Sequence, residues 1–173
     1  MKPPPLSELL VKHALAEVGV EEQPRSSNRG PRVDDYQRAT WLEQKDWGAW
    51  CAAFVCFCMR EAMREGESLG ASYTFHRPQT AGAYDFQNWS LRQDDSTQTK
   101  INPGNDIRRG DIVIFTFSHI GIAASGINEG GHFDTIEGNT NDDGSREGYA
   151  VCHKTGPHGR RPSQIRCRIR LTV

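Results

Sequence analysis

The apolar run that follows Trp50 constrains the fold of this chain more than any other stretch. Between residues 51 and 64, apolar side chains cover most of the circumference of a helix. A helix that is apolar on more than one side lies inside a protein, so this segment predicts a buried helix. The segment 46–49 is short and mostly polar or small, which predicts a loop. We therefore expect Cys51 in the first turn of the buried helix.

That position favours chemistry at Cys51. Backbone N–H groups in the first helical turn lack acceptors within the helix, and the helix dipole is positive there. Both effects favour the thiolate, which is the nucleophilic form of cysteine. A buried cysteine is also often a small apolar side chain with no chemical role. A nucleophilic cysteine needs a histidine and a group that orients this histidine, and both come from distant parts of the chain.

Length and charge indicate one domain and exclude two classes of partner. The 173 residues suit a single compact domain, with residues 1–6 as an extended lead or linker remnant and residues 7–173 as the domain. A net charge of -1 provides no basic surface for nucleic acid. No apolar run approaches the ~18 residues of a membrane span, so we expect no membrane insertion. We expect a monomer.

The cysteines and the first residues bear on the compartment. Five cysteines is an odd number, and their spacing is not that of a disulfide framework. We interpret them as reduced thiols of a protein made in the cytosol. Residues 1–5 lack the apolar centre of a secretory signal, which predicts synthesis in the cytoplasm without a signal peptide.

Two patterns suggest metal binding only weakly. Cys56 and Cys58 are separated by one residue, and on a helix their side chains point about 200° apart. The segment from Asn139 to Gly144 resembles the start of a calcium-binding loop, but Ala150 stands where such a loop needs a bidentate glutamate. We therefore predict no metal and no cofactor.

The order of the predicted elements indicates an α+β domain. Helical patterns precede strand patterns, and the polar run 90–109 between them is interpreted as a surface excursion. Strands joined by short loops are usually antiparallel neighbours. The sequence thus predicts N-terminal helices packed on a C-terminal antiparallel sheet. The predicted helices are 7–18, 33–40, 51–64 and 80–89, and the predicted strands are 111–117, 119–123, 135–139, 149–154 and 165–173.

Alternation along two of these strands groups polar side chains on one face. His119 and Gly121 share a face, and so do Glu137 and Asn139. If this face meets the start of the Cys51 helix, the chain brings together a nucleophile, a base and a group that orients the base. A small residue such as Gly121 would leave room for the helix to approach.

Each of these residues also has a simpler explanation. His119 could be a surface histidine at the end of a strand. Glu137 could be a charged residue at the edge of the sheet, and Asn139 could be the first residue of a turn. His76 is the main competitor for the base, although no predicted helix or strand fixes its position.

Four segments together resemble the CHAP domain, the cysteine- and histidine-dependent amidohydrolase/peptidase domain of the papain-like NlpC/P60 superfamily. The resemblance extends from about Leu9 to about Lys154, and the polar stretch 90–108 is longer than the family leads us to expect. The segments are Trp50-Cys51-Ala52-Ala53-Phe54-Val55, Arg109-Gly110-Asp111-Ile112-Val113-Ile114-Phe115, Ser118-His119-Ile120-Gly121-Ile122 and Ile136-Glu137-Gly138-Asn139-Thr140-Asn141.

The resemblance implies a papain-like NlpC/P60-type fold and a set of site residues. Cys51 would be the nucleophile, His119 the general base and then the general acid, and Glu137 the group that orients the imidazole. Asn139 would support the imidazole or the substrate. The candidate substrate-binding residues are Trp50 and Trp47 as groove walls, where core packing is the alternative, and Gln44 as an oxyanion donor, where a surface position is the alternative.

The resemblance also implies an activity. Members of the family hydrolyse peptidoglycan, at the amide between N-acetylmuramic acid and L-alanine or at a peptide bond of the stem or cross-bridge. We expect action in the periplasm or cell wall after delivery by a route other than a signal peptide, as an antibacterial effector or a phage lysin. An effector would have a cognate immunity protein as partner.

Two other classes of function stay open at this point. The chain could be a cysteine amidase or transferase that acts on an amide outside the cell wall. It could also be a module that binds cell wall or peptide without catalysis. Preferential alkylation of Cys51 separates the enzymes from the binding module.

Overall fold

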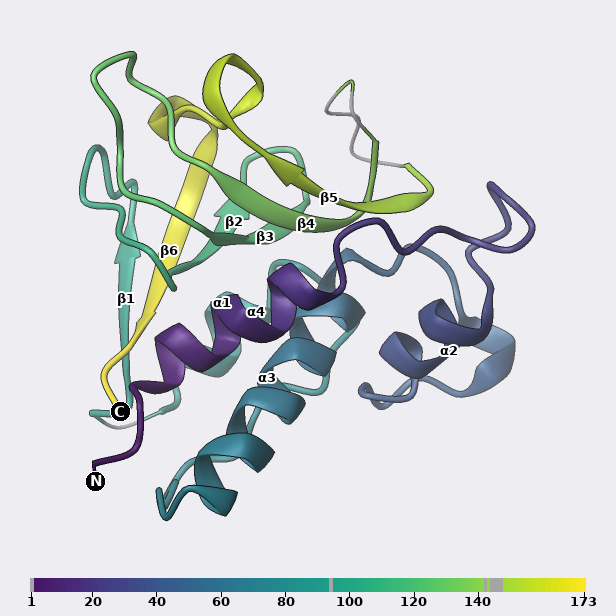
Figure 1. Ribbon diagram of the computed structural model, residues 1–173, viewed down its shortest axis with the longest axis horizontal. Coiled ribbons are helices and arrows are strands. Elements are labelled where there is room, and N and C mark those ends of the chain that lie inside the picture. Colours follow the sequence, from purple (N-terminus) through teal and green to yellow (C-terminus); the bar gives the residue numbers. More distant parts are fainter. Residues whose placement is uncertain (1, 94, 142, 144–147) are drawn as a thin grey trace.

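A computed structural model describes residues 2–93, 95–141, 143 and 148–173 of the chain (Figure 1). Helices occupy the first half and most strands the second half, as an α+β fold requires. The helices are α1 (Leu6–Ala16), α2 (Pro31–Gln37), α3 (Cys51–Ser68) and α4 (Asp85–Ser90), and the strands are β1 (Thr97–Ile101), β2 (Ile112–Phe115), β3 (Ile120–Ala123), β4 (Thr135–Thr140), β5 (Ala150–Lys154) and β6 (Ile165–Leu171).

The described strands form one antiparallel sheet. Their order is β1-β6-β2-β3-β4-β5, so β2 to β5 form a meander and β6 returns to pair with β2. Helices α1 and α3 lie together against the sheet, with α2 beside the start of α3 (Figure 1). The predicted α+β class with helices packed on an antiparallel sheet is confirmed.

The helices match the predicted segments with shifted ends. α1 begins at Leu6, one residue earlier than predicted, with Pro5 as its N-cap residue. α2 begins at Pro31, two residues earlier than predicted, because proline suits the first position of a helix, where no N–H partner is needed. α3 begins at Cys51, as predicted, and continues to Ser68. No helix in the described part of the chain is long and apolar enough to cross a membrane.

The polar run 90–109 contains a strand that the sequence analysis interpreted as surface loop. β1 lies at the edge of the sheet and pairs with β6 from Thr97↔Leu171 to Ile101↔Cys167. Its side chains are half-buried or exposed, so it lacks the apolar alternation that indicates a strand. The strand forms because β6 offers backbone partners, which a local pattern cannot reveal.

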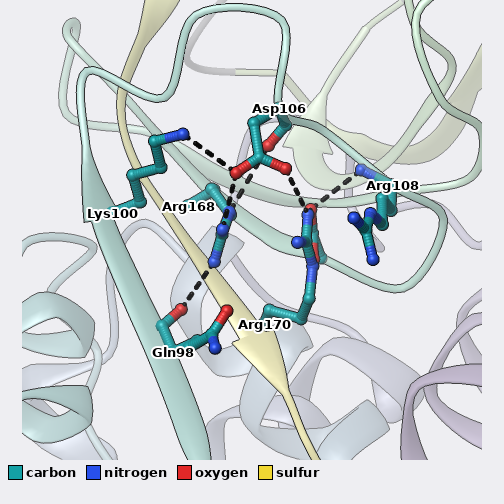
Figure 2. A network of polar contacts seen from close by, with 7 residues as sticks. Gln98, Lys100, Asp106, Arg108, Arg168 and Arg170 are labelled. Atoms are coloured by element: carbon teal, nitrogen blue, oxygen red, sulfur yellow. Dashed lines mark hydrogen bonds and ion pairs between the residues drawn. The ribbon is translucent and has the colours of Figure 1, made fainter.

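Charged side chains connect β6 to the segment that follows β1, as Figure 2 shows. Asp106 accepts hydrogen bonds from Lys100, Arg168 and Arg170, and Asp111 accepts two from Arg170. The hydrogen bond from Arg168, followed by those from Lys100 and Arg170, holds the pKa of Asp106 below its usual range. This network places residues 102–111 and therefore the start of β2.

The two faces of the sheet have different roles. Ile112, Ile114, Ile122 and Ile136 belong to the main core with α1 and α3. The alternate residues point the other way, where Val113, Phe115 and Ala123 form a second cluster with Ile107, Phe133 and Ile165. The helices thus cover the apolar face, whereas the sequence analysis placed the polar face of the sheet against the Cys51 helix.

Two glycines allow the close packing around β4. A Cβ atom at Gly138 would lie 2.7 Å from Phe54 Cβ and 2.8 Å from Trp50 Cζ3, so glycine lets β4 touch α3. A Cβ atom at Gly121 would lie 2.7 Å from Glu137 Cγ. Gly121 therefore makes room for the Glu137 side chain, not for the helix as predicted.

Gly138→Ala is expected to lower the free energy of unfolding by about 1–3 kcal/mol, because the new methyl group overpacks the contact between β4 and α3. Gly48→Ala is the matched control, since a Cβ atom at Gly48 would meet no atom within 4 Å. Chemical denaturation of both variants measures the difference. Equal stability of the two variants would show that β4 and α3 have room to separate.

Candidate active site

A buried histidine and a buried glutamate form a hydrogen-bonded pair at the start of β3 and in β4. His119 Nε2 lies 3.0 Å from Glu137 Oε2, and both side chains are inaccessible to solvent. His119 occupies the last position of the turn before β3, and Glu137 lies in the central part of the adjacent strand. The antiparallel pairing of β3 with β4 therefore brings together two residues that are 18 positions apart.

Cys51 approaches the same histidine from α3. It is the first residue of the helix, and its side chain is almost fully buried. Burial alone would lower the pKa of His119, but hydrogen bonding with Cys51 and Glu137 raises it to about 9. Since Nε2 is engaged by Glu137, the nitrogen left for the thiol is Nδ1, which is buried and has no hydrogen-bond partner among the described residues.

A buried arginine holds Glu137 from the other side. Arg160 donates from Nε to Oε1 at 2.7 Å and from a terminal nitrogen to Oε2 at 2.5 Å. Thr135 Oγ1 donates to Oε1 at 2.6 Å. Burial alone would raise the pKa of Glu137, but Arg160 and His119 lower it strongly. Glu137 is therefore an ionised carboxylate with a fixed orientation.

Two aromatic rings complete the walls around this pair. Phe115 and Phe117 stack against each other at 5.1 Å, and each lies nearly parallel to the His119 ring at about 6 Å. The guanidinium of Arg160 lies over both rings, 5.1 and 5.2 Å from their centroids. These contacts restrict rotation of the imidazole and exclude water from the carboxylate.

This arrangement is suited to covalent catalysis by a thiolate. An imidazole with a raised pKa is able to take a proton from a neighbouring thiol and to hold it as an imidazolium. Glu137 stabilises this cation. Arg160 balances the additional negative charge that is present when both Glu137 and the thiol are ionised. The N–H groups in the first turn of α3 are free of helical acceptors and point toward an anion at that end.

Burial keeps three other thiols in their protonated form. Burial raises the pKa of Cys56 to about 12 and of Cys167 to about 11, and it raises that of Cys58 well above its usual range. None of the five cysteines forms a disulfide bond in the structure. Cys56, Cys58 and Cys167 therefore serve as core side chains.

Asn139 lies two residues after Glu137 on β4, where the strand is irregular. A bulge interrupts the pairing of β4 with β5 between Glu137 and Thr140, and Asn139 has a φ of 55°. The bulge breaks the strict alternation on which the shared face of Glu137 and Asn139 depended. Asn139 instead lines a neighbouring cavity together with Glu22 and Tyr149.

The structure also places the predicted substrate-binding residues. Trp50 is completely buried, so it is a core residue and not a groove wall; its indole N–H donates to Glu22 Oε1 at 2.8 Å. Trp47 is half-buried beneath the guanidinium groups of Arg29 and Arg38. Gln44 is exposed in a short 3-10 turn, seven positions before Cys51 in the sequence.

His76 and the metal patterns have no part in this site. His76 is exposed, and its carbonyl accepts the indole N–H of Trp89. No group of three or more His, Cys, Asp or Glu side chains that could hold a metal occurs among the described residues. In the segment that resembles a calcium loop, Gly144 lies outside the described residues.

Sequence reasoning missed Arg160 and Glu22 as residues of this region. Arg160 lies in the polar segment 156–164 between β5 and β6, where nothing marks it as buried. Glu22 lies between α1 and α2, where no sequence pattern singles it out. The local sequence does not reveal that a charged residue is buried, because the groups that neutralise its charge come from other parts of the chain.

The fold and the cysteine–histidine–glutamate geometry define a papain-like hydrolase domain. Comparison with family models agrees, since the model of the CHAP domain matches residues 42–139. The chain belongs to the CHAP domain family, whose members are generally cysteine- and histidine-dependent amidohydrolases. No curated protein and no solved structure matched the chain. The matched region contains Cys51, His119 and Glu137 but neither Glu22 nor Arg160.

The imidazolium of His119 is expected to lose its proton near pH 9. Cys51→Ala and Glu137→Gln each remove a group that raises this pKa, so both variants should titrate closer to the ordinary value of 6.5. Since the pKa is raised on folding, the stabilisation is complete below about pH 6.5 and is lost as the pH rises through 9. NMR titration of the ring protons measures these midpoints. A wild-type midpoint near 6.5 would contradict the proposed contacts.

Arg160→Met is expected to lower the free energy of unfolding by roughly 3–5 kcal/mol, because it leaves a buried carboxylate with one cation fewer. The pKa of Glu137 should rise, so acid unfolding should occur at higher pH. Arg160→Lys should restore part of both effects. The exposed neighbour provides the control, since Arg161→Met should change stability by no more than about 0.5 kcal/mol. Denaturant and pH titrations followed by circular dichroism test this prediction.

Proposed function

We propose that the protein hydrolyses an amide bond of peptidoglycan through a thioacyl-enzyme on Cys51. The observation that supports this most is the contact of one buried histidine with both Cys51 and an ionised, arginine-held Glu137. Membership of the CHAP family supports amide hydrolysis and points to peptidoglycan as substrate. Composition agrees, since nothing in it suggests nucleic acid or a membrane as partner.

Acylation begins when His119 holds the proton of the Cys51 thiol. The thiolate attacks the carbonyl carbon of the scissile amide, forming a C–S bond and a tetrahedral oxyanion. The Cys51 backbone N–H at the start of α3 can donate to this oxyanion, and one such donor is typically worth 10²–10³ in rate. The C–N bond then breaks, and the imidazolium proton at Nδ1 passes to the leaving nitrogen.

Deacylation reverses the role of His119. Neutral imidazole takes a proton from water, and the resulting hydroxide attacks the thioester carbonyl. The C–S bond breaks, the carboxylic acid product leaves, and the thiolate–imidazolium pair returns. Glu137 keeps its proton-free state throughout, because Arg160 and His119 both stabilise its charge. Its role is to orient the imidazole and to stabilise its cationic form.

The substrate implies where the enzyme acts. Peptidoglycan lies in the periplasm or cell wall, so a role there requires delivery from the cytosol, as an antibacterial effector or a phage lysin. In the effector case, a cognate immunity protein that covers the Cys51 site would protect the producing cell. Co-purification with a neighbouring gene product tests that partner, and its absence would favour the lysin.

Digestion of purified sacculi tests the activity. Wild-type protein should release soluble fragments, whereas Cys51→Ala should remain folded and reduce release by at least about 10³-fold. Free stem peptides with intact glycan would identify an amidase. Shortened or uncrosslinked muropeptides would identify an endopeptidase. Mass spectrometry of the released material distinguishes these products.

Two controls make the result specific. Cys152→Ala removes a half-buried thiol that pairs opposite Glu137 on β5 but has no role in the proposed mechanism, so it should leave release unchanged. Iodoacetamide at mildly acidic pH should label Cys51 faster than Cys56 or Cys58, whose thiols are kept protonated by burial. No release from any type of sacculus by folded wild-type protein that alkylates at Cys51 would contradict the peptidoglycan substrate and favour another amide.

A further inference from the structure

A polar cavity lies directly beside the cysteine–histidine–glutamate site. It has a volume of about 460 Å³, and Glu22, Asn28, Asn139 and Tyr149 are among its lining residues. Ala49 also lines it and stands two residues before Cys51, so its Cα lies within about 7 Å of that of Cys51. Asn139 follows Glu137 by two residues on β4. A group bound in this cavity would therefore be one or two residues away from a scissile amide at Cys51.

Glu22 is the acidic residue among those that line this cavity. Only one of its two carboxylate oxygens has a hydrogen-bond partner among the described residues. Its side chain is more than nine-tenths buried, and Oε1 accepts the Trp50 indole N–H. Oε2 is buried and has no hydrogen-bond partner among the described residues. Glu22 also forms no ion pair with any residue that the structure describes, unlike its neighbour Glu21, which pairs with Arg25.

A buried carboxylate oxygen without a donor is costly, because the group has given up its hydration. Native proteins rarely leave such a group unpaired unless a ligand or water completes it. Among the described residues, no lysine or arginine lines the cavity, and the lining side chains other than Glu22 are neutral. A donor that supplies both a positive charge and N–H groups suits this site best, and a primary ammonium group has both properties.

The backbone keeps Glu22 in this position whether or not a ligand is bound. Its N–H donates to the carbonyl of Tyr149 at 2.8 Å, and the preceding Glu21 forms an antiparallel bridge with Ala150. Trp50, which holds Oε1, is packed against Tyr36 with ring centroids 5.5 Å apart. The carboxylate is thus fixed before binding, which lowers the entropic cost of recognition.

We propose that Glu22 is a specificity residue that binds a free primary ammonium group of the substrate peptide. This deepens the proposed function and rests on it for the identity of the peptide. A free amine in a stem peptide can be the α-amine of its first residue or the side-chain amine of its diamino acid. Acetylation of either amine removes the charge and adds bulk, so an acylated or cross-linked amine should bind poorly.

The test measures binding to the Cys51→Ala variant, which makes the readout independent of turnover. The probes are a synthetic stem pentapeptide with lysine as third residue and both amines free, and two derivatives acetylated at the α-amine or at the lysine side chain. Isothermal titration calorimetry should show that one acetylation weakens binding at least about 10-fold. The derivative that loses affinity identifies the amine that Glu22 binds.

The second arm removes the charge of Glu22. In the Cys51→Ala background, Glu22→Gln should bind the free-amine peptide about as weakly as the acetylated one, because glutamine keeps an acceptor for Trp50 but has no charge. Glu21→Gln is the matched control, since it removes the same charge from the exposed neighbouring residue and should leave the preference unchanged. Thermal unfolding of each variant reports whether the fold is intact.

Equal affinity for the free and acetylated peptides would overturn the proposal, and this comparison needs no substitution at Glu22. A preference that persists in folded Glu22→Gln would also overturn it, as would the absence of binding by any peptide. These outcomes are separable from a failure of the proposed function. Sacculus digestion by wild-type protein tests hydrolysis, while the peptide titrations test recognition.

Discussion

The site depends on the ion pairs and hydrogen bonds of the buried Glu137 carboxylate. A carboxylate without solvent is strongly destabilised unless cations and hydrogen bonds replace its hydration. Arg160 and His119 supply the charges, and Thr135 supplies a further donor. The same contacts orient the imidazole toward Cys51 and favour its protonated form. Stability and reactivity therefore have one physical origin, and a change to either cation affects both.

Such a site requires a sheet whose faces differ. The isoleucines of β2, β3 and β4 pack on α1 and α3, while the opposite face carries Glu137 and the aromatic rings beside it. The sheet and the helix still approach closely enough for Cys51 to reach His119, because Gly138 allows backbone contact with α3. A larger residue at that position would separate the nucleophile from its base.

Trp50 connects the catalytic site with the cavity beside it. Its ring packs on Tyr36 and against Gly138, its indole N–H fixes Glu22, and its backbone precedes Cys51. The aromatic residue expected to contact substrate thus acts from the core. It sets the spacing between the nucleophile and a carboxylate whose second oxygen is buried without a hydrogen-bond partner among the described residues. In the proposed function, one buried side chain therefore positions both the nucleophile and the carboxylate that would bind substrate.

The sequence by itself determined the buried helix that starts at Cys51, the α+β class and the strands from residue 112 onward, because hydrophobic periodicity is a local property of the chain. It also singled out Cys51, His119 and Glu137 as candidates. Only the tertiary structure decided that β1 pairs at the sheet edge, that Trp50 is core, that Asn139 and Glu22 line one cavity, and that Arg160 holds Glu137. These features depend on partners distant in sequence, and burial of a charge is favourable only where such partners meet.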